Sequence, residues 1–96
     1  MTVIFTGPAR KQVRDIIAHS HKTYGPMTAQ IYVQGMQNTL SHLDKNPGTG
    51  RKRDELGPDI VSFPSGSHMI FYRVVLVGIE VLAVIHQRDD VGKYFS

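Results

Sequence analysis

Two stretches of helical periodicity, separated by a short breaker, constrain this chain most. Apolar residues recur at the spacing of one helix face in both stretches: first at Ala9, Val13, Ile16, Ile17 and Tyr24, then at Ala29, Tyr32, Val33, Met36, Leu40 and Leu43. Gly25-Pro26 separates them, because glycine suits a helix C-terminus and proline cannot continue a helix. Two helices joined so closely form an antiparallel hairpin, and both apolar stripes need a common surface to cover.

The flanking segments predict a β-sheet as that surface. Residues 2–5 are β-branched or aromatic and favour a strand. Thr6 then fits a helix N-cap and Pro8 the first helical turn. After the second helix, which we expect to end at Asn46-Pro47-Gly48, residues 49–58 form a polar loop. The apolar period then changes from 3.6 to 2, which predicts strands at 59–63, 68–75 and 79–86, and a last helical turn around 91–95.

The predicted architecture is therefore α+β in the order β-α-α-β-β-β, with the helical hairpin on one face of a mostly antiparallel four-stranded sheet. Two-residue turns at Ser65-Gly66 and Val77-Gly78 would set the register. The face toward the helices would then collect Val61, Phe63, Ile70, Tyr72, Val74, Ile79, Val81, Ala83 and Ile85. The opposite face would collect Ser62, Met69, Phe71, Arg73, Val75, Glu80, Leu82, Val84 and His86. Because charged side chains must reach water or a partner, we expect this second face to be open.

Length and composition exclude several classes of protein. The 96 residues are enough for one domain, taken as residues 1–96. The chain has no cysteine for a disulfide or thiolate site, and its five histidines match no zinc-ligand spacing, so we expect no metal or other cofactor. Apolar runs are far shorter than the roughly 20 residues of a membrane span, and the first residues do not resemble a signal peptide, which favours a cytoplasmic protein. The net charge of +3 favours an acidic partner.

Motifs in this order resemble the RelE/ParE toxin superfamily, and their detail looks most like the ParE branch. They are Asn46-Pro47-Gly48-Thr49-Gly50-Arg51 after the second helix, the hairpin around Gly66–Arg73, and the final strand that ends in His86. The resemblance extends from Phe5 to about Asp90. It implies the toxin of a type II toxin–antitoxin pair, neutralised by a small ParD-like antitoxin in a hetero-oligomer. It further implies that the toxin inhibits DNA gyrase by binding, without direct sequence-specific binding of nucleic acid.

A RelE-like, ribosome-dependent mRNA endoribonuclease is the alternative. Metal-free RNA cleavage needs an acid, a base and cations close together, and Arg73, His86 and the basic segment 51–53 motivate this reading. Yet the expected register puts His86 roughly 13 Å along the strand from Arg73. The catalytic tyrosine of the RelE branch has no match, since Tyr94 follows two aspartates. We therefore favour a binding protein with no catalytic residue.

Candidate contacts to a partner or target follow from the expected open face and from the basic segment. They are Arg51, Arg53, Met69, Phe71, Arg73, Leu82 and His86. Arg73 could equally be the salt-bridge partner of Glu80, and His86 could be a packed histidine at a strand end. A third hypothesis is a chain that binds antitoxins but has lost its toxicity.

Overall fold

The predicted helical hairpin is present in the computed structural model, which describes residues 2–95. Helix α1 spans Gly7–Tyr24 and α2 spans Pro26–Lys45. Thr6 caps α1 as expected, because its side chain accepts a hydrogen bond from the Ala9 amide at 3.2 Å. Gly25, between the helices, has a φ of 91°, which glycine adopts without the penalty of a side chain.

The sheet has five strands where four were expected. They are β1 (Thr2–Phe5), β2 (Arg51–Lys52), β3 (Val61–Ser65), β4 (His68–Val75) and β5 (Gly78–His86), in the spatial order β1-β5-β4-β3-β2. β1 runs parallel to β5, and the other pairings are antiparallel. The additional strand β2 comes from the segment expected to be a polar loop. It follows a short 3-10 helix, η1 (Pro47–Thr49).

Both hairpin turns lie one residue away from their predicted positions. Ser65 pairs with His68 and Val75 with Gly78, so the turns are Gly66-Ser67 and Leu76-Val77. Each error shifts the register by two residues, and a shift of two does not by itself change the face of a side chain. The predicted turns would place Arg73 opposite Leu82; that register is wrong, and Arg73 lies directly opposite Glu80.

A β-bulge in β5 overturns part of the predicted face assignment. Tyr72 pairs with Val81 but Phe71 pairs with Ala83, so Leu82 is an extra residue. Beyond Leu82 the side chains of β5 lie on the faces opposite to those predicted. Val84 packs under the helices, and Ala83 and Ile85 lie on the other side of the sheet.

Side chains from the first helical segment hold this bulge. The Thr6 hydroxyl donates to the Leu82 carbonyl at 3.2 Å. The Val84 amide donates to Gln12 Oε1 at 2.8 Å. Backbone groups that the bulge removes from the ladder are thereby paired, as buried amides require.

The sheet separates two apolar cores. The helix-side core contains Ala9, Met36, Leu40, Leu43, Ile70, Tyr72, Ile79, Val81 and Val84. The second core, on the opposite face, contains Ile60, Phe71, Ala83 and Ile85, with Leu56, Met69, Leu82, Val91 and Phe95 packed against it. Val74, expected in the helix-side core, is instead 54% exposed.

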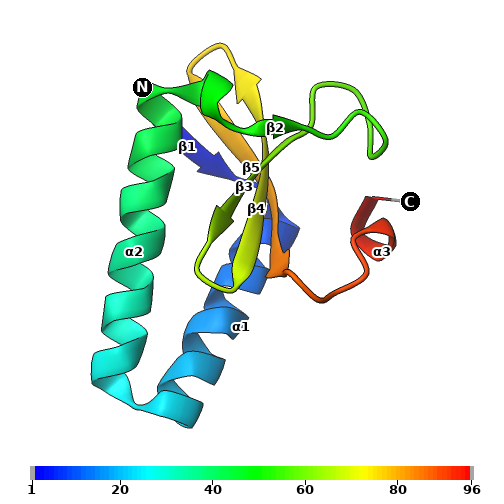
Figure 1. The fold of residues 1–96 in the computed structure, drawn as a ribbon. Coiled ribbons are helices and arrows are strands. Elements are labelled where there is room, and N and C mark those ends of the chain that lie inside the picture. Colours follow the sequence, from blue (N-terminus) through cyan, green and yellow to red (C-terminus); the bar gives the residue numbers. More distant parts are fainter. Residues whose placement is uncertain (1, 96) are drawn as a thin grey trace.

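The chain itself covers part of the face that we expected to be open. The 53–60 loop and α3 (Gly92–Phe95) lie on the side of the sheet away from α2 (Figure 1). Phe71 is fully buried there, 5.3 Å from the Phe95 ring and 5.4 Å below the Arg53 guanidinium. The prediction of an open face is therefore wrong at Phe71, which a partner cannot reach in this conformation.

Within residues 2–95, no helix is long and apolar enough to cross a membrane.

Candidate functional site

The uncovered part of the face opposite the helices carries an ion pair. Arg73 Nε donates to Glu80 Oε1 at 2.6 Å, and the two side chains are 51% and 23% exposed. Both partners are fixed by the β4–β5 ladder, in which they are directly paired. Arg73 thus lies on the face that the sequence predicted, but much of its charge is already engaged by Glu80.

Met69 and Leu82 are half-buried against the second core. Met69 of β4 lies opposite Ile85 of β5, and Leu82 is the bulge residue of β5. Each therefore exposes part of its side chain beside the covered region. They remain candidates for contact with a partner, whereas Phe71 does not.

The basic segment 51–53 divides into exposed and engaged cations. Arg51 and Lys52 are exposed on the edge strand β2. Arg53 is held in place: its Nε donates to Glu55 at 2.8 Å and its NH1 donates to Ser62 Oγ at 3.2 Å. Its hydrogen bond holds the pKa of Glu55 below its usual range. Arg53 therefore fastens the covering loop to the sheet, and Arg51 is the better candidate for an intermolecular contact.

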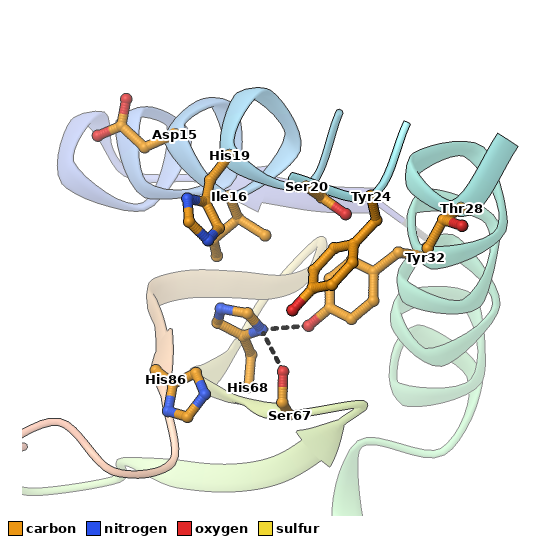
Figure 2. Close-up of a pocket in the computed structure, with 10 residues that line it drawn as sticks. All are labelled: Asp15, Ile16, His19, Ser20, Tyr24, Thr28, Tyr32, Ser67, His68 and His86. Atoms are coloured by element: carbon orange, nitrogen blue, oxygen red, sulfur yellow. Dashed lines mark hydrogen bonds between the residues drawn. The ribbon is translucent and has the colours of Figure 1, made fainter. Parts of the chain in front are cut away.

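His86 lines a different region, a pocket of about 450 Å³ between the helical hairpin and one end of the sheet. It lies opposite His68, whereas the predicted turns would place it opposite Met69. The two imidazoles meet edge to face with centroids 5.3 Å apart. Figure 2 shows His19 of α1 pointing toward them from above, with Tyr24 and Tyr32 alongside. No pattern in the sequence indicated this pocket, because its residues come from four separate segments.

Hydrogen bonds fix His68 in the middle of this pocket. Its Nδ1 pairs with the Tyr32 hydroxyl, and Ser67 Oγ lies 3.4 Å away (Figure 2). The Tyr32 hydroxyl also lies 3.1 Å from the Ser65 carbonyl, to which it can donate. Burial is the main cause that lowers the pKa of His68 below 6.5, and His86 and His19 lower it further, while Asp89 opposes them. Burial raises the pKa of Tyr32. Both effects favour neutral side chains.

Two apolar patches are exposed to solvent. One lies at the tip of the helical hairpin, where Tyr24, Met27 and Ile31 are 67%, 76% and 68% exposed. We name it the hairpin-tip patch. The other surrounds the β4–β5 turn, with Leu76 fully exposed and Val74, Val77 and Ile4 partly so. The sequence assigned Tyr24 to a buried stripe, and its position in the last turn of α1 takes it beyond the sheet.

The arrangement offers little for cleavage of a phosphodiester. His86 lies opposite His68, five residues along β4 from Arg73, which is roughly 17 Å of strand. Glu80 is engaged by Arg73, and His86 is too far away to act with them on one phosphate. Over residues 2–95, no three histidine or carboxylate side chains are grouped to hold a metal ion.

Comparison with known sequences decides the family. Residues 3–91 match the family described as the ParE toxin of the type II toxin–antitoxin system parDE. The chain belongs to the ParE toxin family. It is 34% identical over 86 residues to Toxin ParE1 of Mycobacterium tuberculosis, which covers 88% of each chain. It is 33% identical over 79 residues to Toxin ParE1 of Caulobacter vibrioides, covering 82% of this chain and 81% of that protein. This ParE protein is accordingly a ParE-like type II toxin.

Solved structures share the ParE fold seen here. A chain of the chromosomal ParDE system from P. aeruginosa superimposes with a TM-score of 0.74 at 22% identity, over 90% of this chain and 95% of that one. A chain of the YoeB–YefM complex from Staphylococcus aureus gives 0.60 at 15% identity, over 91% and 97%. At these identities the likeness concerns the fold alone.

Proposed function

We propose that this toxin acts in the cytoplasm by binding DNA gyrase, without catalysis, and that a small ParD-like antitoxin neutralises it. The observation that carries the proposal is membership of the ParE family along nearly the whole chain. The geometry supports the non-catalytic part, since Glu80 is engaged by Arg73 and His86 lies opposite His68, five β4 residues away from Arg73.

The exposed apolar patches support a protein partner. Solvent-exposed clusters such as the hairpin-tip patch and the residues around Leu76 favour association in a soluble protein. The uncovered residues Arg73, Met69 and Leu82, and Arg51 on β2, offer a further mixed surface beside the covered part of the sheet. We assign gyrase or antitoxin contacts to these surfaces.

Co-expression tests the antitoxin. We expect a tagged toxin to co-purify with the product of an adjacent short gene, and induction of the toxin alone to arrest growth that the antitoxin restores. A toxin that binds no such product and leaves growth unchanged would contradict the proposal.

A supercoiling assay tests the target. Purified gyrase should lose supercoiling activity when the toxin is added and regain it when antitoxin follows. Translating ribosomes treated in parallel should keep their mRNA intact. Cleavage of mRNA in the ribosomal A site with unaffected gyrase would establish the RelE-like alternative instead. Tight antitoxin binding without either effect would indicate a chain that has lost its toxicity.

A further inference from the structure

The pocket between the hairpin and the sheet presents imidazole nitrogens that have no hydrogen-bond partner among the described residues. His86 Nδ1 accepts from the Arg88 amide at 3.1 Å, so the proton of the neutral ring lies on Nε2. The Tyr32 hydroxyl donates to the Ser65 carbonyl and so accepts from His68 Nδ1, which leaves Nε2 of the neutral His68 ring with a lone pair and no proton. Within the described part of the chain, neither Nε2 atom nor the ring of His19 has a hydrogen-bond partner. Three imidazole rings thus present nitrogens to one cavity, and His68 Nε2 can donate there once the ring is protonated (Figure 2).

Among the described residues, no carboxylate is hydrogen-bonded to these imidazoles. Asp15 of α1 lines the pocket, but its Oδ2 pairs with Lys11 at 3.0 Å, and Figure 2 shows it pointing away from the imidazoles. Asp89, after β5, lines the neighbouring hollow together with Asp15, His68, His86 and Tyr94, and its charge raises the pKa of His68. α2 contributes only Tyr32 as a titratable group, and β4 and β5 contribute His68 and His86. Three imidazoles therefore face the cavity, and two carboxylates, Asp15 and Asp89, lie beside them.

The surroundings of the cavity indicate its occupant. Tyr24 both lines the pocket and belongs to the hairpin-tip patch, so the apolar surface continues to the pocket mouth. A protein segment with apolar side chains and an acidic one would cover both surfaces. The net charge of +3 favours an acidic segment.

We propose that this imidazole pocket binds a carboxylate side chain of the antitoxin, and that the imidazoles take up protons when it binds. The inference rests on the proposed function, since it assumes an antitoxin partner. A carboxylate beside an imidazole favours the imidazolium form and raises its pKa in the complex. The toxin must then bind the antitoxin more tightly as the pH falls from above the imidazole pKa of the complex toward the lower imidazole pKa of the free toxin.

Calorimetric titration of the toxin with its antitoxin tests this proposal. Complete uptake of one proton lowers Kd about tenfold for each unit by which the pH falls. Partial uptake therefore predicts that binding is about three- to tenfold tighter at about pH 6 than at about pH 8. Titrations in buffers of different ionisation enthalpy should report net proton uptake. The double variant His19→Gln/His86→Gln keeps polar side chains that cannot become charged, and should lose most of both effects. The matched control is His21→Gln, which alters an exposed histidine of α1 outside the pocket and should retain both.

Imidazole NMR of the wild-type toxin provides a readout that needs no variant. The pKa values of His68 and His86 should rise on binding. Unchanged values, absent proton uptake, or a double variant with the wild-type pH dependence would overturn the inference and leave antitoxin binding intact. A toxin that binds no antitoxin at any pH would instead overturn the proposed function, and this inference with it.

Discussion

Replacing Gln12 by methionine should destabilise the protein far more than its place on a helix suggests. Gln12 Oε1 is the acceptor for the Val84 amide, 2.8 Å away, just beyond the bulge in β5. Val84 is 1% exposed, so water cannot replace the lost acceptor. Methionine has a similar size and helix propensity, which confines the change to the hydrogen bond.

The expected loss follows from the cost of an unpaired buried amide, about 1–3 kcal/mol. We take about 2 kcal/mol as the central value. For a domain of this size each kcal/mol lowers Tm by about 4–8 °C, so the melting temperature should fall by roughly 8–16 °C.

Urea denaturation measures this free energy directly, and an unchanged m-value would show that the unfolded state is unaffected. Gln34→Met is the matched control, because Gln34 is exposed on α2 and bonds only Asn38. That control should change stability by less than about 0.5 kcal/mol. If Gln12→Met costs no more than Gln34→Met, the bulge does not depend on the helix, and the reasoning is refuted.

Three further substitutions test other parts of the structure. Gly78→Ala should cost about 2 kcal/mol or more in urea denaturation, because its Cβ would overlap the backbone of Thr2 and separate β1 from β5; a neutral result would contradict this pairing. Arg73→Ala should change stability by about 1 kcal/mol or less, since Arg73 is half-exposed and water screens its bond to Glu80, and a much larger loss would show a structural role. For His68, the lowered pKa means that the unfolded chain binds the proton more tightly, so this contribution to stability is present above about pH 6.5 and is lost as the pH falls toward the folded pKa. His68→Asn should flatten the dependence of the urea midpoint on pH in that range, and an unchanged profile would assign it to other groups.

The helical hairpin and the β4 strand were predictable because their signals are local. Glycine and proline at positions 25 and 26 end one helix and begin the next, whatever lies beneath them. The alternation from His68 to Val75 defines a strand with the predicted bounds. The misplaced turns changed the predicted pairs of residues but not the predicted faces, since a shift of two residues preserves the face of each side chain.

The bulge could not be predicted, because the residues around it are all apolar. Leu82, Ala83, Val84 and Ile85 would suit either face, so alternation carries no information there. Gln12 and Thr6, about 70 residues earlier in the sequence, determine which face these side chains take. Their hydrogen bonds stabilise the inverted register.

The candidate site was predictable to the same extent. Arg73 is exposed on the expected face because strand alternation placed it there. Phe71 shares that alternation, yet the 53–60 loop and α3 bury it, and no periodicity encodes how a loop folds back.

The sequence by itself determined the two long helices and four of the five strands, because caps, breakers and periodicity act over a few residues, and its motifs resembled the ParE family. Only the tertiary structure decided which part of the sheet stays uncovered and that His19, His68 and His86 share one pocket. Those outcomes depend on contacts between distant segments, whose free energies arise only when the chain has packed.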